Sequence, residues 1–265
     1  MKIIRIMLEA VKRDASYLIG AIITVAVLSM MFTQHDWQSK PIVVASLELP
    51  SDLPDFASIS NVKDKKAEFF AYLRPLIKKA NGKIKYKKEL FTSLVNKLEK
   101  ENYHSNVTLK KMRKLAKEFG MDVTTIESNL DELQMRIDII PSSLVLAQAA
   151  NESAWGTSRF AIQANNLFGQ WCYTKGCGLV PNSRNKGSHH EVRKYDSIQD
   201  SISSYMNNLN SHQAYRDLRN IRAGLRRRGQ PISGVQMAQG LSSYSERGDE
   251  YVKELISMIT HNGLE

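Results

Sequence analysis

One carboxylate in this sequence lies where its surroundings would alter its chemistry. Pro141 and Ser142 predict the start of a helix, because proline suits the first turn and a serine hydroxyl can accept a hydrogen bond from a free N–H. Leu144, Gln148 and Glu152 follow at four-residue spacing, so Glu152 ends the helix on the face that carries Leu144. Apolar neighbours disfavour an ionised carboxylate and raise its pKa, which suits a general acid. The alternative is an exposed glutamate at a frayed helix end.

Two motifs surround this glutamate. Residues 147–156 read AQAANESAWG, and residues 165–169 read NNLFG. In these motifs the chain resembles the bacterial glucosaminidase-domain family, whose mark is A-Q-A-x-x-E-S-x-W-G followed by N-N-L-F-G. RIDIIPSS before the helix, a C-x4-C pair after it and NLNSHQAYRDLR further on make the chain similar to the Bax-type subgroup of Gram-negative bacteria. The resemblance covers about residues 136–265 and, more weakly, the lysine-rich segment before them.

The resemblance implies a fold and an activity. The expected fold is mainly α, a lysozyme-like α+β domain whose small β-lobe overhangs a sugar cleft, preceded by further helices. The expected reaction is hydrolysis of the β-1,4 bond between N-acetylglucosamine and N-acetylmuramic acid in peptidoglycan glycan strands. That reaction needs a proton for the leaving oxygen, and the family's catalytic glutamate falls on Glu152. No cofactor and no metal are expected.

The second catalytic group is less sharply defined. In the family a second acid lies a few tens of residues downstream on the β-lobe, and Glu191, just before a predicted strand at residues 192–195, is the nearest such carboxylate. If Glu191 is the base, a water fits between two carboxyl groups about 6.5 to 9.5 Å apart and the anomeric configuration inverts. In the alternative, the substrate's own N-acetyl group acts as the nucleophile.

The resemblance also points to Tyr244. The family has a glycine–tyrosine pair, followed several residues later by another tyrosine and a helix. Here Ser243 replaces the glycine, and Tyr251 is the later tyrosine. A phenol in the cleft can hydrogen-bond the substrate's N-acetyl group or the attacking water, so Tyr244 is a candidate catalytic residue. The alternative is a structural tyrosine.

Four more motif residues are candidates for substrate binding. Trp155 can wall the acid or stack against a sugar ring, or it can be a core tryptophan. Asn165 and Asn166 can orient backbone or sugar amides, or they can form a structural turn. Phe168 belongs either to the cleft wall or to the core.

The two cysteines of the chain, Cys172 and Cys177, bracket four residues. In an oxidising exported space they can form a disulfide, which for so small a ring contributes about 2 kcal/mol. A metal site would need two further ligands, and although residues 189–191 read HHE, no zinc spacing is completed. We therefore expect a disulfide.

The N-terminal region predicts a membrane anchor. Residues 15–35 contain no charged side chain and would reach about 31 Å as a helix, enough to cross a bilayer. Four basic residues precede this stretch, so residues 1–14 are expected in the cytoplasm and the rest of the chain in the periplasm, tethered by a single span to the inner membrane. The alternatives are a cleaved signal peptide and a buried core helix.

After the expected anchor, composition divides the chain into three parts. Residues 36–61 contain three prolines and several serines and are expected to form a linker, residues 62–135 a helical segment, and residues 136–265 the catalytic domain. The formal charge of +10 suggests an acidic partner. Lysines between residues 78 and 88 form either an ordinary solvated face or a surface that attracts wall polymer or lipid. The arginines at residues 226–228 form either a solvated helix end or a group that attracts muropeptide carboxylates.

Two classes of function fit these features. One is a membrane-anchored peptidoglycan hydrolase, and the other is a non-catalytic wall-binding or assembly module that keeps the same cleft. A binding module does not need Glu152 within an intact motif, whereas a hydrolase does, so the hydrolase is favoured. A nucleotide-dependent protein is not favoured, because the sequence contains no phosphate-binding glycine-rich loop. The expected export of the domain argues against nucleic acid as the partner.

Overall fold

The computed structural model describes residues 52–102, 104–122, 126–182, 184 and 187–265, and the described residues from Asp52 onward form one compact unit. The predicted cytoplasmic tail, membrane span and first part of the linker, residues 1–51, lie outside the described residues. Among the residues that are described, no helix combines the length and the apolar character needed to cross a membrane.

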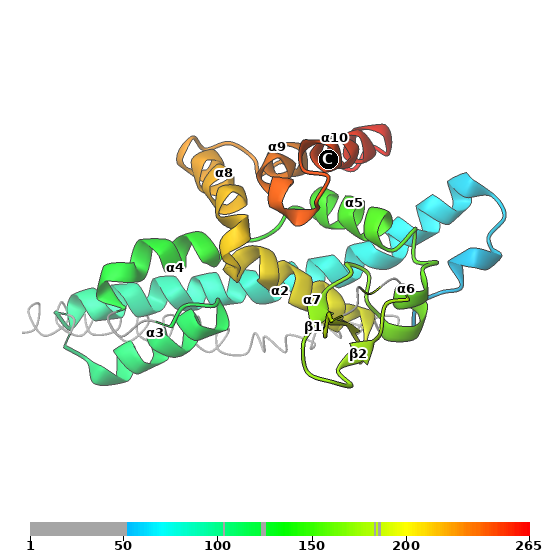
Figure 1. Cartoon of the computed structure of the whole chain (residues 1–265). Helices are drawn as coiled ribbons and strands as arrows, with labels where there is room; N and C mark the ends of the chain where they lie inside the picture. The colour runs from blue at the N-terminus through cyan, green and yellow to red at the C-terminus, as the bar shows by residue number, and fades with distance from the viewer. Residues whose placement is uncertain (1–51, 103, 123–125, 183, 185–186) are drawn as a thin grey trace, which may run out of the picture. The chain divides into compact units, whose positions relative to one another are not determined.

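The described part of the chain is mainly helical and carries one small sheet, which confirms the expected α+β class (Figure 1). In the N-terminal half the elements are η1 (Phe56–Ser58), α2 (Val62–Lys100), α3 (Asn106–Glu118), η2 (Glu127–Asn129), α4 (Leu130–Arg136), α5 (Ser142–Glu152) and α6 (Arg159–Ala164). They are followed by β1 (Trp171–Cys172), β2 (Gly178–Leu179), β3 (Glu191–Arg193), α7 (Ile198–Ser211), η3 (Gln213–Tyr215), α8 (Arg216–Arg227), α9 (Gly234–Ala238), η4 (Gln239–Tyr244) and α10 (Asp249–His261).

The long helix α2 contributes to two hydrophobic cores. Asn61 caps its start, with the side-chain oxygen accepting hydrogen bonds from the backbone N–H groups of Lys63 and Asp64. Apolar residues of its first half pack with α5, α7, α9 and α10, and those of its second half pack with α3 and α4. The first half of the expected helical segment is therefore part of the same core as the expected catalytic domain.

Helix α5 lies inside the first core. Its bounds confirm the predicted start at Ser142 and the predicted end at Glu152, although no side chain caps its first turn. Its apolar residues are buried on every face, because α2 packs on one side and α9 and α10 pack on others. Gly234 allows the close approach of α9, since a side chain there would collide with Ser143. A helix enclosed in this way holds its final residue in a fixed position.

The β-lobe is an antiparallel sheet with the strand order β1-β3-β2. The predicted strand after Glu191 is confirmed as β3, which pairs with β1 through Cys172 and with β2 through Leu179. The Cys172–Cys177 disulfide is also confirmed. After the lobe, α7 buries the apolar face that its spacing predicted.

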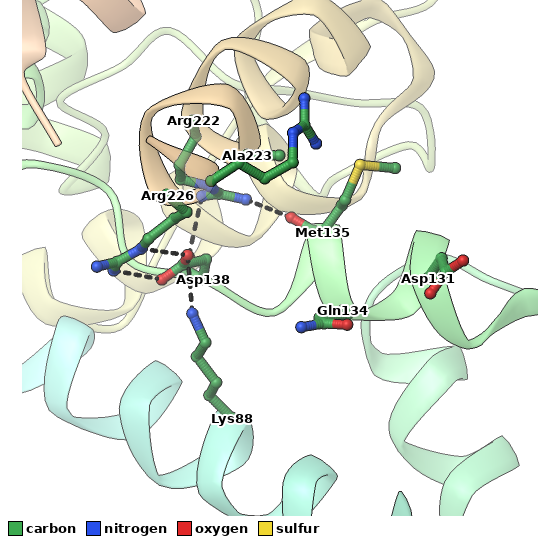
Figure 2. A pocket seen from close by; sticks show the side chains of 9 residues that line it. Lys88, Asp131, Gln134, Met135, Asp138, Arg222, Ala223 and Arg226 are labelled. Atoms are coloured by element: carbon green, nitrogen blue, oxygen red, sulfur yellow. Dashed lines mark hydrogen bonds and ion pairs between the residues drawn. The ribbon is translucent and has the colours of Figure 1, made fainter. Parts of the chain in front are cut away.

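An ion-pair cluster around buried Asp138 joins α2 and α8 to the segment between α4 and α5. Asp138 accepts two hydrogen bonds of 3.0 Å from Arg226 of α8 and pairs with Lys88 of α2 at 2.9 Å (Figure 2). Burial raises the pKa of Asp138, but hydrogen bonds from Arg226 and Lys88 outweigh it and hold the pKa at about 2. The arginines at residues 226–228 are all exposed, as the predicted solvated run requires, and the Arg226 guanidinium also binds this carboxylate.

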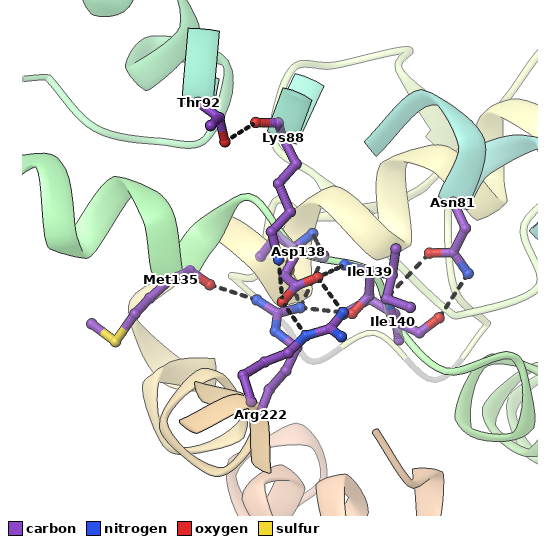
Figure 3. Close-up of polar contacts among 10 residues, drawn as sticks. Asn81, Lys88, Thr92, Met135, Asp138, Ile139, Ile140 and Arg222 are labelled. Carbon is purple, nitrogen blue, oxygen red and sulfur yellow. Dashed lines mark hydrogen bonds and ion pairs between the residues drawn. The ribbon is translucent and has the colours of Figure 1, made fainter. Parts of the chain in front are cut away.

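Backbone contacts complete the same junction. Fully buried Arg222 donates to the carbonyls of Met135, Asp138 and Ile139 (Figure 3). Asn81 of α2 exchanges two hydrogen bonds with the backbone of Ile140, at 2.8 and 3.1 Å. The segment that leads into α5 is thereby fixed from both sides. A cavity of about 400 Å³ beside the cluster is lined by none of the residues that surround Glu152.

The end of the expected linker is attached to the core rather than free. Phe56 of η1 is buried and packs edge-on against Phe69 and Tyr72, with ring centroids 5.3 and 6.0 Å apart. Its ring also lies against Gly156, where a Cβ atom would approach it to 2.7 Å. Residues around Phe56 therefore support the turn that follows α5.

Candidate active site

Glu152 is the last residue of α5 and is half-buried. The helix ends because Ser153 turns back on it: its hydroxyl donates to the Ala149 carbonyl at 2.5 Å and accepts from the Gly156 N–H at 2.8 Å. The next residues, Ala154, Trp155 and Gly156, all have positive φ, a left-handed conformation that is costly for the two that are not glycine. A tight turn with little freedom therefore follows the carboxylate.

The pKa of Glu152 is raised above its ordinary value of 4.5. Burial is the largest cause, and the negative charge of Glu254 adds to it. A hydrogen bond from Tyr251 and the positive charge of Arg247 act in the opposite direction without cancelling the effect of burial. A carboxyl group that keeps its proton to higher pH can donate it, which is the state that a general acid needs.

A chain of hydrogen bonds orients this carboxyl group. The buried Tyr205 hydroxyl donates to the side-chain oxygen of Gln148, whose amide nitrogen donates to the Tyr251 hydroxyl at 3.0 Å. The Tyr251 hydroxyl in turn hydrogen-bonds Glu152. Since Gln148 lies one helical turn before Glu152 on the same face, α5 fixes the spacing between these two members of the chain.

Tyrosine rings pack together beside Glu152. Tyr244 stacks on Tyr251 with centroids 5.4 Å apart and planes 5° apart, and it lies near Tyr205 and Tyr215 at 6.4 and 6.0 Å. Burial raises the pKa of all four hydroxyls, and the charge of Glu152 raises them further. The phenols therefore stay protonated and serve as hydrogen-bond donors or acceptors.

The structure gives Tyr244 a specific hydrogen bond. Its hydroxyl donates to the Phe168 carbonyl at 3.0 Å. Phe168 itself is buried, with its ring stacked on Tyr205 at 3.8 Å. Both predicted residues thus lie in the aromatic packing next to Glu152, where they join η4 to the NNLFG segment.

Trp155 turns away from this packing toward α2. Its ring packs edge-on against Phe69 and Phe70, with centroids 5.7 and 5.3 Å away, and the ammonium group of Lys66 lies 4.8 Å from its centre. These contacts match the core alternative for the tryptophan and explain how the turn after Glu152 is anchored.

The two asparagines form the turn of the NNLFG segment. Asn165 ends α6 in the left-handed conformation and donates to the Tyr195 carbonyl at 3.1 Å. Buried Asn166 donates to the carbonyls of Gln170 and Arg193 and accepts from two backbone N–H groups. These bonds use the side-chain donors and acceptor of Asn166 within the fold, so they match the structural alternative.

Glu191 lies against the disulfide loop. Its carboxylate accepts hydrogen bonds from the backbone N–H groups of Gly176 and Gly178 at 3.0 and 2.8 Å, and these bonds lower its pKa. The side chain is only 6% exposed. Cys172 and Cys177 lie close enough to Glu191 to suggest a metal site, but their sulfurs are joined to each other and provide no thiolate.

Sequence reasoning missed several residues around Glu152. Gln148 carried a usable signal, since it lies four residues before Glu152 in the AQAANESAWG motif. Arg247 and Glu254 pair at 2.8 Å and carried no comparable signal, because the packing of α10 on α5 brings them near Glu152. Tyr205 of α7 carried none either, since its hydrogen bond to Gln148 joins residues 57 positions apart.

Comparison with known proteins gives two matches. A glucosaminidase family model, described as mannosyl-glycoprotein endo-β-N-acetylglucosaminidase, matches residues 127–264. Protein bax of Escherichia coli (strain K12) is 31% identical over 214 residues, which cover 80% of this chain and 75% of that protein. No solved structure matches the chain.

Proposed function

This chain belongs to the glucosaminidase family as a Bax-type member, and we propose that it hydrolyses peptidoglycan at the β-1,4 bond between N-acetylglucosamine and N-acetylmuramic acid. The observation that carries the proposal is the half-buried carboxyl group of Glu152, with its raised pKa and its hydrogen bond to Tyr251. A lysozyme-like cleft and a periplasmic location behind the span at residues 15–35 belong to the same proposal.

Glu152 acts as the general acid in this mechanism. It donates its proton to the bridging oxygen as the bond from that oxygen to C1 of N-acetylglucosamine breaks, and N-acetylmuramic acid leaves with a new hydroxyl group. Tyr251 and Gln148 hold the carboxyl group in one orientation, and Glu254 helps it to keep its proton until the substrate arrives.

The second group is proposed to be Glu191, acting as a base toward water. Its two amide contacts favour the ionised form that a base requires, but they also tie the carboxylate to the disulfide loop. Glu191→Gln separates these roles. A large loss of rate with unchanged thermal stability supports a base, whereas an unchanged rate assigns the second step to the N-acetyl group of the substrate.

Mass spectrometry of digestion products tests the proposal directly. The full-length chain is expected to release fragments whose new reducing end is N-acetylglucosamine. Glu152→Gln is expected to lower the rate by about 10² to 10⁴, because it removes the proton donor with little change in shape. Products ending in N-acetylmuramic acid would contradict the bond assignment. Binding to peptidoglycan without any new reducing end would instead identify a binding module.

A further inference from the structure

The β-lobe presents exposed aromatic side chains that the reaction at Glu152 does not use. Trp171 of β1 is 54% exposed, and Tyr173, two residues along, is 74% exposed. His190 stacks on the Trp171 ring, with centroids 4.0 Å apart and planes inclined by 18°. Half of the large exposed apolar side chains among the described residues fall between residues 162 and 180. An exposed aromatic group of this kind is characteristic of a binding surface.

This aromatic surface is held rigidly from below. Trp171 directly precedes Cys172, and His190 directly precedes Glu191; Cys172 and Glu191 face each other in the sheet. The disulfide closes the loop after Cys172, while the Glu191 carboxylate binds two amides of the same loop. The rings of Trp171 and His190 therefore lie next to the residues that fix the loop. A surface that is already ordered loses little conformational entropy on binding.

A short piece of chain connects this surface to the candidate acid. The Phe168 carbonyl accepts a hydrogen bond from Tyr244, whose ring stacks on Tyr251 beside Glu152. Two residues lie between Phe168 and Trp171, so the span is at most about 11 Å. A glycan strand that is bound at Glu152 can therefore extend over the lobe.

We propose that Trp171, backed by His190 and accompanied by Tyr173, binds the peptidoglycan strand by stacking on one of its pyranose rings, away from the bond that is cleaved. This inference rests on the proposed function for the identity of its ligand. A pyranose ring suits the site because its C–H groups form an apolar face that can cover the indole, while its hydroxyl groups stay in water.

Calorimetric titration with glycan strands that carry no stem peptides tests this proposal. The full-length chain with Glu152→Gln is used, so that the ligand is not consumed. Adding Trp171→Ala is expected to raise the Kd about tenfold, and adding Trp171→Phe is expected to restore most of the affinity. The matched control is Tyr86→Ala, which removes a ring of α2 that is 67% exposed and is expected to leave the Kd unchanged.

Three results distinguish the outcomes. Equal affinities for the Trp171→Ala and Tyr86→Ala proteins would overturn the proposal. The proposal would also be overturned if Trp171→Ala weakened binding to phosphatidylglycerol vesicles but not binding to the glycan. That result would assign the surface to a membrane. The third result is glycan binding that depends on Trp171, together with no release of reducing ends by the unsubstituted chain. It would support the binding surface and reject only the proposed hydrolysis.

Discussion

The Tyr251 hydroxyl hydrogen-bonds the Glu152 carboxyl group and so joins α10 to the end of α5. Because this bond stabilises the ionised carboxylate, it lowers the pKa of Glu152 against the larger effect of burial. The same bond orients the group that would donate the proton. Tyr251 is thus expected to affect both the orientation and the titration of the acid.

Replacing Tyr251 by phenylalanine separates these effects. Without the hydroxyl, the pKa of Glu152 rises, and the alkaline limb of the pH–rate profile is expected to move to higher pH. The maximal rate is expected to fall about 10- to 100-fold, because the carboxyl group is no longer held in place. Tyr86→Phe, on the exposed face of α2, is the control. An alkaline limb that does not move would show that Tyr251 has no influence on the acid.

Glu152 also links stability to pH. Its pKa is above 4.5 in the folded chain. Between pH 4.5 and that raised pKa, the folded state therefore binds more protons than the unfolded state. The free energy of unfolding falls as pH rises through this window. Glu152→Gln is therefore expected to increase the Tm at pH 7, by about 2 to 4 °C for each kcal/mol gained, and to give no increase below pH 4.5. Calorimetry with exposed Glu89→Gln as the control measures this difference, and a lower Tm at pH 7 would contradict it.

Asp138 is expected to be a major determinant of stability. Asp138→Asn leaves the charges of Lys88 and Arg226 without their carboxylate and is expected to cost about 2 to 3 kcal/mol in urea unfolding at pH 7, in line with the lowered pKa of Asp138. Since the pKa of Asp138 falls from 3.8 to about 2, its contribution is present above pH 3.8 and is lost as pH falls toward 2. Asp131→Asn, an exposed acid beside the same cavity, is expected to cost less than about 1 kcal/mol. Equal losses from the two variants would contradict a special role for Asp138.

The turn after Glu152 provides a test of packing. Gly156→Ala places a methyl group against the Phe56 ring at a φ of +78° and is expected to cost about 2 to 4 kcal/mol, measured by denaturant unfolding. Ala154→Gly, two residues earlier at a φ of +50° and exposed, is expected to be neutral or to stabilise by up to about 1 kcal/mol. A Gly156→Ala protein as stable as the parent would show that Phe56 moves aside freely.

Local features were predictable from the sequence. The bounds of α5, the buried face of α7 and the strand at Val192 follow from periodicity and from proline and serine signals, which act over a few residues. The Cys172–Cys177 pair followed from its spacing and from the expectation that the domain is exported. These features depend on neighbours in sequence, so short-range patterns suffice to find them.

The remaining features depend on contacts between distant segments. No pattern showed that Tyr251 would reach Glu152, or that Lys88 and Arg226 would meet at Asp138, because helical periodicity identifies a buried face but not the helix that covers it. The role of Asn166 also depends on contacts with distant residues. Its type is common in both turns and sugar sites, and only the positions of Gln170 and Arg193 show that its bonds are internal.

At helix α2, the match to the family model and the hydrophobic core divide this chain differently. The part that matches the family model starts at residue 127, yet α5 packs against residues of α2 that precede that point. A fragment cut at residue 127 would lose a wall of its own interior and expose the apolar side of α5 to water. The smallest fragment that keeps this core intact is therefore larger than the stretch that the family model matches.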